Sequence, residues 1–261
     1  MTDTAAIAVH GRTLEVRTIA GRDPDPALPA LVFLHEGLGS VSLWRDFPDQ
    51  VAAATGLRAV VYSRHGHGRS EALAATHGVD YMHREALEVL PALLATLGVT
   101  APLLVGHSDG ASIALIHAGA GHAAAGLVLM APHVFVEDLS IASIARVRTT
   151  FETTEMAEKL ARHHVDARGT FYRWNDIWLH PDFRQWNIEE SLDGIRCPVL
   201  VIQGEDDEYG TMAQPAAIAA RCAGGVECVA LARCGHSPHR DQPEATLAAV
   251  SGFVRAVLGR A

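Results

Sequence analysis

The segment G-H-S-D-G at residues 106–110 is the strongest chemical signal in the sequence. It has the form G-x-S-x-G and lies between an apolar, strand-like run at 103–105 and an apolar helical stretch at 111–118. On a sharp turn from a strand into a helix, a serine hydroxyl stands exposed at the carboxyl edge of the sheet, above the free N–H groups of the helix. This context predicts that Ser108 is a nucleophile.

A serine hydroxyl is a weak nucleophile, so a base and an orienting acid are expected as well. Three consecutive acids follow the strand-like run 199–202: Glu205, Asp206 and Asp207. The next strand-like run, 226–231, is followed by His236, and His239 comes three residues later as a second candidate for the base. Both groups follow strands, and the carboxyl ends of strands are where open α/β sheets bind ligands. The order serine, acid, histidine is the one that nucleophile-elbow enzymes require.

The elements that must position these residues alternate along most of the chain. Strands are expected at 14–18, 30–34, 58–62, 103–105, 127–130, 199–202 and 226–231. Helices are expected between them, at 43–54, 81–97 and 111–118. Continuous apolar strands separated by helices indicate a mostly parallel sheet covered on both faces, so the sequence predicts a doubly wound α/β fold.

One stretch, 133–196, breaks this alternation. It has no buried strand; helical patterns at 141–148 and 155–164 precede an aromatic patch. The patch contains Phe171, Tyr172, Trp174, Trp178, Phe183 and Trp186. Such residues can form the core of a small helical subdomain or line a ligand pocket, and we expect both. The predicted organisation is a core domain of residues 1–132 and 197–261 with an inserted helical cap at 133–196, in which Trp174 and Trp178 contact the substrate.

These features together resemble the α/β-hydrolase superfamily over nearly the whole chain. In that family the acid follows its strand as G-x-x-D, which corresponds to residues 204–207 here and selects Asp207. The family's base is the histidine of a G-H pair after the last strand, which selects His236. The resemblance implies that His236 takes the proton of Ser108 while Asp207 orients the imidazole.

The same resemblance implies an oxyanion hole made of two backbone N–H groups. One belongs to the residue after the nucleophile, Asp109. The other comes from the loop at 35–40, which reads H-E-G-L-G-S where the family usually has H-G-x. By position the donor is Gly37, and Leu38 takes its place if the loop is one residue longer. Glu36 replaces the family's glycine.

Asp109 and Glu36 also bear on the substrate. Valacyclovir hydrolase has a similar G-x-S-D-G elbow, in which the aspartate receives the α-amino group of amino-acid esters. The similarity implies that Asp109, helped by Glu36, binds a cationic acyl group. Alternatively, Asp109 caps its own helix.

The sequence therefore predicts a serine esterase that cleaves a small carboxylic ester. A preference for an amino-bearing acyl group follows only if Asp109 binds the substrate and does not cap its helix. The alternatives are a carbon–carbon bond hydrolase of ring-cleavage products and a ligand-binding protein with little turnover. The serine argues against a haloalkane dehalogenase, since those enzymes carry aspartate at this position.

Composition and charge argue against nucleic acid and a membrane as partners, so the expected partner is a small-molecule substrate. The net charge is −9 and basic clusters are absent, which argues against nucleic acid. Apolar runs such as 127–132 are far shorter than the about 20 residues that cross a membrane, and the start lacks the features of a signal peptide. The four cysteines form no C-x-x-C pair, so reduced thiols in a cytoplasmic protein are expected. The histidine pairs lack partners at metal-site spacing and no dinucleotide motif occurs, so neither metal nor cofactor is predicted.

Overall fold

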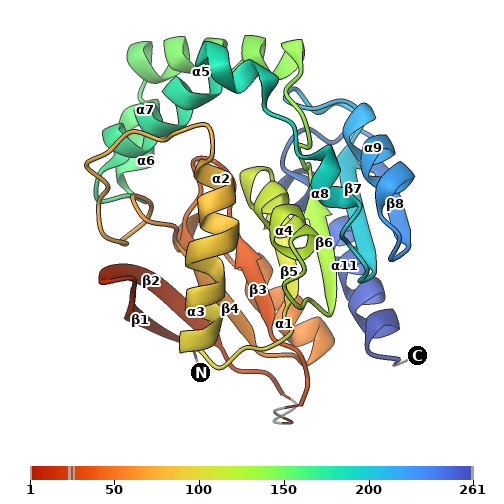
Figure 1. The fold of residues 1–261 in the computed structure, drawn as a ribbon. Helices are drawn as coiled ribbons and strands as arrows, with labels where there is room; N and C mark the ends of the chain where they lie inside the picture. The colour runs from red at the N-terminus through yellow and green to blue at the C-terminus, as the bar shows by residue number, and fades with distance from the viewer. Residues whose placement is uncertain (1, 23–24, 26, 260–261) are drawn as a thin grey trace.

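The computed structural model describes residues 2–22, 25 and 27–259, and in this part of the chain eight strands form one sheet (Figure 1). The strands are β1 (Thr2–Val9), β2 (Arg12–Ile19), β3 (Leu31–Leu34), β4 (Ala59–Tyr62), β5 (Leu103–His107), β6 (Gly126–Met130), β7 (Val199–Gly204) and β8 (Val226–Leu231). Their order is β1-β2-β4-β3-β5-β6-β7-β8. Strand β2 is antiparallel to both its neighbours, and β4 to β8 run parallel with β3. The predicted doubly wound, mostly parallel sheet is confirmed.

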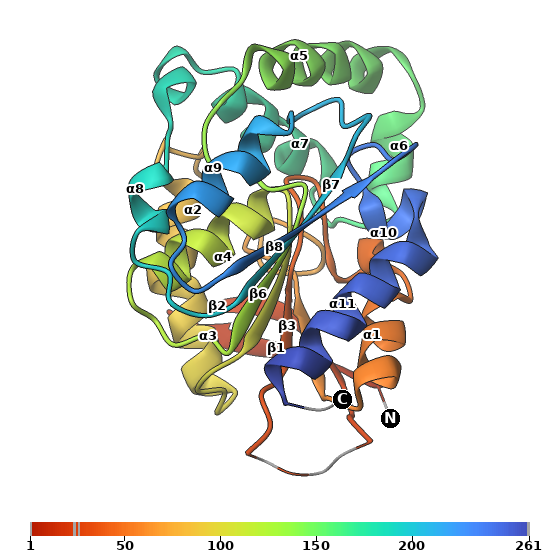
Figure 2. The ribbon, with the colours of Figure 1, turned by 90° about the vertical axis from the view of Figure 1, so that its right-hand side faces the viewer.

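Helices cover both faces of the sheet (Figure 2). One face carries α1 (Phe47–Thr55), preceded by a 3-10 turn η1 (Val41–Trp44), and α11 (Pro243–Val257), preceded by α10 (Pro238–Asp241). The other face carries α2 (Tyr81–Arg84), a π-helical turn η2 (Glu85–Val89), α3 (Leu90–Thr96), α4 (Asp109–Gly119), α8 (Glu189–Leu192) and α9 (Ala213–Arg221). The π-helical turn ends two residues before Pro91, which has no N–H to donate to the preceding turn of a regular helix.

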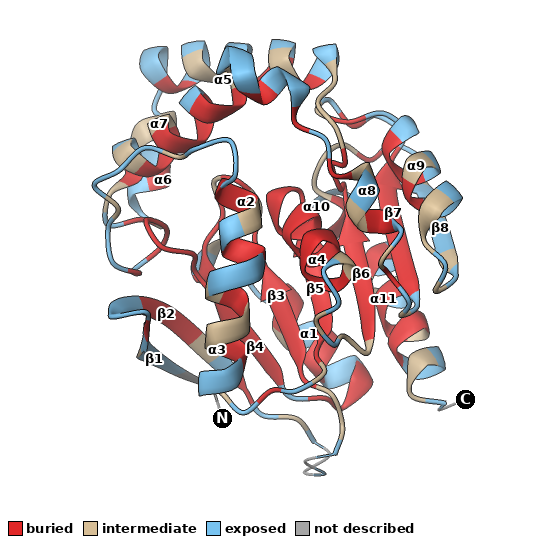
Figure 3. Cartoon of the chain, in the orientation of Figure 1, coloured by how far each residue is buried: buried red, intermediate tan, exposed pale blue. Residues whose placement is uncertain are grey.

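The core lies on both sides of the central strands, as the burial colours show (Figure 3). In β3, Leu31 and Phe33 pack with the layer of α1 and α11, whereas Val32 and Leu34 pack with the layer of α4. All four side chains are fully buried. Both faces of each central strand must therefore be apolar, which explains the continuous hydrophobic runs in the sequence.

Between β6 and β7 the chain forms α5 (Asp138–Thr153), α6 (Met156–Ala161), α7 (Ala167–Trp178), a 3-10 turn η3 (Pro181–Gln185) and α8. Helices α5, α6 and α7, here called the cap helices, contact one another and lie across the carboxyl edge of the sheet (Figure 1). Helix α8 instead packs against α4 and α9. The last part of the predicted insertion at 133–196 thus lies beside helices of the core.

Several elements differ from the sequence-based expectation, among them α9 and α11, which were not predicted. Strand β1 was not predicted either, because it is an edge strand whose apolar stretch at 5–9 consists mostly of alanine, a residue that is not typical of strands. Helix α7 contains the first four residues of the aromatic patch, for which the sequence predicted no helix. The helix expected at 43–54 is split, because Arg45 takes a left-handed backbone conformation (φ 54°) that ends the 3-10 turn before α1 begins. No helix in the described part of the chain combines the length and the apolar character needed to cross a membrane.

Candidate active site

Ser108 occupies a strained turn between β5 and α4. Its backbone has φ 53° and ψ −119°, a conformation that non-glycine residues rarely adopt. The Ser108 N–H donates to the Met130 carbonyl at 2.9 Å, extending the pairing of β5 with β6. Helix α4 also passes close to β3, since a Cβ on Gly110 would come within 2.0 Å of the Leu34 carbonyl oxygen. These constraints explain the strand–serine–glycine–helix pattern and place the hydroxyl at the carboxyl edge.

The structure joins Ser108, His236 and Asp207 in one chain of hydrogen bonds. The Ser108 hydroxyl is 2.9 Å from His236 Nε2, and His236 Nδ1 is 2.9 Å from both carboxylate oxygens of Asp207. A carboxylate facing Nδ1 holds the proton there, which leaves Nε2 free to accept the serine proton. Asp206 is exposed, and His239 packs between Trp44 and Phe47 instead. The geometry therefore favours the register selected from the sequence.

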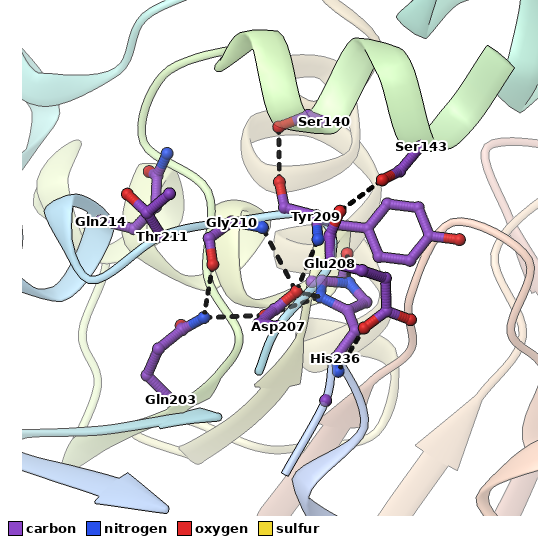
Figure 4. Close-up of polar contacts among 12 residues, drawn as sticks. Ser140, Ser143, Gln203, Asp207, Glu208, Tyr209, Gly210, Thr211, Gln214 and His236 are labelled. Atoms are coloured by element: carbon purple, nitrogen blue, oxygen red, sulfur yellow. Dashed lines mark hydrogen bonds and ion pairs between the residues drawn. The ribbon is translucent and has the colours of Figure 1, made fainter. Parts of the chain in front are cut away.

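Asp207 is held as a carboxylate by donors around it (Figure 4). The backbone N–H groups of Tyr209 and Gly210 donate to Oδ1 at 2.8 and 3.2 Å, and Gln203 Nε2 donates to Oδ2 at 2.7 Å. Burial alone would raise the pKa of Asp207, but the His236 and Tyr209 hydrogen bonds hold it below its ordinary value. For His236 the two effects have the opposite signs: burial alone would lower its pKa, but Asp207 raises it above the ordinary value.

Two serines of cap helix α5 contact the segment that binds Asp207. Ser143 Oγ donates to the Glu208 carbonyl and Ser140 Oγ to the Tyr209 carbonyl, both at 2.5 Å (Figure 4). Each of these carbonyls belongs to a peptide unit whose N–H points to Asp207. The cap helices are therefore linked through two peptide units to the acid of the triad, a contact that the sequence pattern did not reveal.

The backbone N–H groups expected to form the oxyanion hole are free to bind a ligand. Neither Gly37 nor Leu38 donates its N–H to another described residue, and both line the cavity beside Ser108. Asp109 is the first residue of α4, so its N–H has no acceptor within the helix. The two alternatives for the second donor, Gly37 and Leu38, both fit this arrangement.

Three histidine rings form hydrogen bonds with backbone carbonyls of the loop 35–40. Three rings contact successive carbonyl oxygens: His35 at Glu36 (2.7 Å), His67 at Gly37 (3.0 Å) and His164 at Leu38 (3.0 Å). His164 comes from the segment between α6 and α7, and its Nδ1 accepts the N–H of Gly68 at 2.9 Å. The N–H groups of Gly37 and Leu38 share peptide units with the carbonyls of Glu36 and Gly37, so each points away from the histidine that contacts its carbonyl. His67 and His164, which each have a second histidine within two positions in the sequence, thus hold this loop in place.

Glu36 lines the cavity but already has partners. Its carboxylate lies 3.5 Å from His107 Nδ1 and 3.9 Å from a nitrogen of Arg240. Burial alone would raise the pKa of Glu36, but His107 and then Arg240 hold it well below the ordinary value. His107 in turn donates from Nε2 to the His236 carbonyl at 2.6 Å. Glu36 is therefore an ionised group on the cavity wall that faces His107 and Arg240.

Asp109 does not fit the substrate-binding role expected from the sequence. Its side chain is 1% exposed, it is absent from the cavity lining, and Oδ2 lies 3.4 Å from Arg64 and 2.7 Å from the Tyr81 hydroxyl. Nor does its carboxylate accept a hydrogen bond from a described backbone N–H of α4, since Oδ2 accepts from Arg64 and Tyr81 and Oδ1 has no partner. The order of the strands explains this pairing. Arg64 follows β4, which lies on the other side of β3 from β5, and so reaches the same carboxyl edge of the sheet as Asp109. The carboxylate thus forms a buried ion pair with Arg64 through Oδ2 and does not face the cavity.

A cavity of about 240 Å³ opens between Ser108 and the cap helices. Its apolar lining consists of Leu38, Ile144, Val147, Met156, Trp174 and Trp178. Trp174 lies against Gly37, where a Cβ would come within 2.1 Å of the indole nitrogen, and Trp178 donates to the Tyr81 hydroxyl at 3.1 Å. The two predicted tryptophans therefore line the cavity, whereas the other aromatic residues of the patch pack elsewhere.

Sequence reasoning missed several residues of the cavity. Ile144 and Val147 lie on a helix that was predicted, so helical spacing could have indicated their shared face. His133, Glu208 and Tyr209 also line the cavity, but single residues in loops left no pattern to detect.

Comparison with known proteins places this geometry in a family. A sequence profile described as the Alpha/beta hydrolase family matches residues 31–250. The chain is 33% identical over 128 residues to the mouse (Mus musculus) sn-1-specific diacylglycerol lipase ABHD11. That match covers 49% of this chain and only 36% of the lipase.

Two solved structures share the fold. The haloalkane dehalogenase DbeA from Bradyrhizobium elkani superposes with a TM-score of 0.78 at 20% identity, over 99% of both chains. The enol-lactonase from Burkholderia xenovorans superposes with a TM-score of 0.72 at 20% identity, over 98% of this chain and all of that one. The fold and the profile match agree: the chain belongs to the alpha/beta hydrolase family.

Proposed function

We propose that this protein is a serine esterase that cleaves a small carboxylic ester through an acyl-enzyme. The observation that carries the proposal is the hydrogen-bonded chain from Ser108 through His236 to Asp207, with both contacts to the imidazole at 2.9 Å. A base within hydrogen-bond reach of a nucleophile, itself oriented by a buried acid, is the arrangement that covalent acyl transfer needs.

In the proposed reaction, the Ser108 oxygen attacks the ester carbonyl while His236 Nε2 takes the serine proton. Asp207 stabilises the resulting imidazolium, and the Asp109 N–H with that of Gly37 or Leu38 binds the negative oxygen. Collapse of the tetrahedral intermediate transfers the proton to the departing alcohol and leaves Ser108 acylated. Water then attacks the acyl-enzyme, with His236 again accepting and returning a proton.

The cavity supports a small acyl group. Its volume of about 240 Å³ is below the range of roughly 300–1,000 Å³ that is usual for drug-sized ligands. Six apolar side chains line it, so burial of a short hydrocarbon chain is favourable. The names of two similar proteins, a diacylglycerol lipase and an enol-lactonase, denote cleavage of acyclic and cyclic esters.

The proposal does not include a preference for an amino-bearing acyl group. Asp109, which carried that expectation, is paired with Arg64 and lies outside the cavity. Glu36 remains on the wall, but His107 and Arg240 face its carboxylate. Halide displacement is not proposed either, because the elbow carries serine in place of the aspartate used by dehalogenases.

The test is a pre-steady-state experiment with 4-nitrophenyl acetate, butanoate and octanoate. We expect a burst of nitrophenol equal to the enzyme concentration, and a kcat/KM that is highest for the two short esters. Ser108→Ala, folded by circular dichroism, should give no burst. Saturable binding of these esters without release of nitrophenol would instead identify a ligand-binding protein. Cleavage of a vinylogous diketone in the absence of ester turnover would identify a carbon–carbon hydrolase.

A further inference from the structure

His133 is a buried histidine that faces the substrate cavity and that the proposed mechanism does not use. It lies in the loop after β6, is 2% exposed, and lines the same cavity as Ser108. Its ring centroid is 5.6 Å from that of His236 and 5.2 Å from that of Trp178. The ring therefore lies beside the reacting groups, between the base and the wall of the acyl pocket.

Neither nitrogen of the His133 ring hydrogen-bonds to any residue in the described part of the chain, and Nδ1 is fully buried without a partner. In five other buried histidines a ring nitrogen contacts a backbone carbonyl: His35, His67, His107, His117 and His164. His65 and His239 also have a buried ring nitrogen without a partner, but of these three only His133 lines the cavity beside Ser108. A buried polar atom without a partner is unfavourable and usually has a specific reason. A ligand cannot reach the buried Nδ1, but Nε2 also lacks a partner and is not among the fully buried atoms, so a ligand in the cavity can bond to Nε2.

The backbone on both sides of His133 is held in place. Its carbonyl accepts a hydrogen bond from Ser112 Oγ at 2.6 Å, and the next N–H, of Val134, donates to Gln214 Oε1 at 2.7 Å. Two residues earlier, Ala131 has a left-handed backbone conformation with φ 47°. Gly210 closes one side of the ring, since a Cβ there would be 3.3 Å from His133 Cε1. The imidazole is therefore preorganised, as expected for a recognition group.

The charge state of His133 decides which ligand it suits. Burial, and then the neighbouring His236, lower the pKa of His133 to about 3. The ring is neutral at pH 7, so one nitrogen donates and the other accepts. An uncharged oxygen can bond to such a ring without the cost of moving an ion into an apolar cavity.

We propose that His133 forms a subsite for an uncharged oxygen, a hydroxyl or a ketone, on the acyl part of the substrate. This inference rests on the proposed esterase function and narrows its substrate class from plain alkanoyl esters to hydroxyacyl and oxoacyl esters. The apolar side chains bind the hydrocarbon part, and the His133 ring selects the polar substituent.

The test compares isosteric nitrophenyl esters that differ by one oxygen. One pair is 3-hydroxybutanoate and 3-methylbutanoate, the other is 2-hydroxypropanoate and 2-methylpropanoate, and 3-oxobutanoate tests the ketone. For the wild-type enzyme, kcat/KM should favour the oxygen-bearing member of at least one pair by about three- to tenfold, the size of one neutral hydrogen bond. This measurement needs no variant.

His133→Phe should abolish that preference by weakening only the oxygen-bearing ester, and His133→Gln, which restores a donor and an acceptor, should recover part of it. His83→Phe is the matched control, because His83 also has a buried ring nitrogen without a partner but lies outside this cavity. Equal kcat/KM within every pair for the wild type would overturn the subsite while leaving the esterase intact. An equal loss on all esters in His133→Phe would assign the ring to packing around His236 alone. Absence of turnover on every ester would instead contradict the esterase function itself.

Discussion

Replacing Asp109 by asparagine tests how much the buried ion pair between Asp109 and Arg64 contributes to the stability of the protein. The side chains of Arg64 and Asp109 are 4% and 1% exposed, so the substitution leaves a guanidinium buried without its counter-ion. Breaking a buried pair in this way typically costs about 3–5 kcal/mol, against about 0–1 kcal/mol for an exposed pair. Because the contact is long, at 3.4 Å, we expect the lower end, about 3 kcal/mol of the free energy of unfolding.

The assay is urea denaturation at pH 7, supported by thermal unfolding. A loss of about 3 kcal/mol corresponds to a fall in Tm of about 6–12 °C for a domain of this size. Arg64→Met should also be destabilising, and the double variant should lose less stability than the sum of the two, because no charge is then left unpaired. The control is Glu205→Gln, an exposed acid, for which the change should stay within about 0.5 kcal/mol.

The same variant separates this account from a cation-binding role for Asp109. Asp109→Asn should lower kcat/KM for amino-acid esters and for neutral esters by the same factor, measured well below its Tm. Wild-type stability combined with a selective loss of amino-acid ester hydrolysis would refute the ion-pair interpretation.

Three further outcomes follow from the site. Asp207→Asn should lower kcat by about ten-thousandfold, whereas Asp206→Asn should have little effect, since only Asp207 meets the imidazole; steady-state kinetics of the two variants checks this. Asp207 raises the pKa of His236, and the base must be neutral, so kcat/KM should fall with decreasing pH through a midpoint above the ordinary histidine value; a pH–rate profile with a midpoint below it would contradict this. Replacing Ser140 and Ser143 together by alanine should lower kcat by about tenfold with a smaller change in KM, because the peptides that bind Asp207 lose their support; a change confined to KM would assign the serines to ligand binding.

Much of the fold could be predicted because the central strands are apolar on both faces. The runs that became β3, β5 and β7 have no other stable location than the middle of a covered sheet. Strand β1 was not detected because the apolar stretch of this largely exposed edge strand is mostly alanine, which gives no clear strand signal. Helix α7 escaped because its aromatic residues served equally well as a signal for packing and for a pocket.

Some residues of the candidate site could likewise be predicted from the sequence, and others could not. Ser108 was predictable because a strained strand-to-helix turn limits which residues can flank it. The ion pair of Asp109 with Arg64 was not, since the two residues are 45 positions apart and meet only through the order of the strands. His133 gave no signal because one histidine in a loop resembles any other until its neighbours are known. A nucleophile on a characteristic turn can therefore be predicted from the sequence. Predicting which residue pairs with a buried charge also requires the order of the strands in the sheet.

The most direct test of the central claim is covalent labelling with a fluorophosphonate, followed by mass spectrometry of the intact protein and of its peptides. An activated serine should give one adduct per chain, located on Ser108, and no adduct in Ser108→Ala. Labelling should be strongly slowed in His236→Ala, because the base that takes the serine proton is missing. A folded, unlabelled wild-type protein, or an adduct on a different serine, would contradict the assignment of Ser108 as the nucleophile.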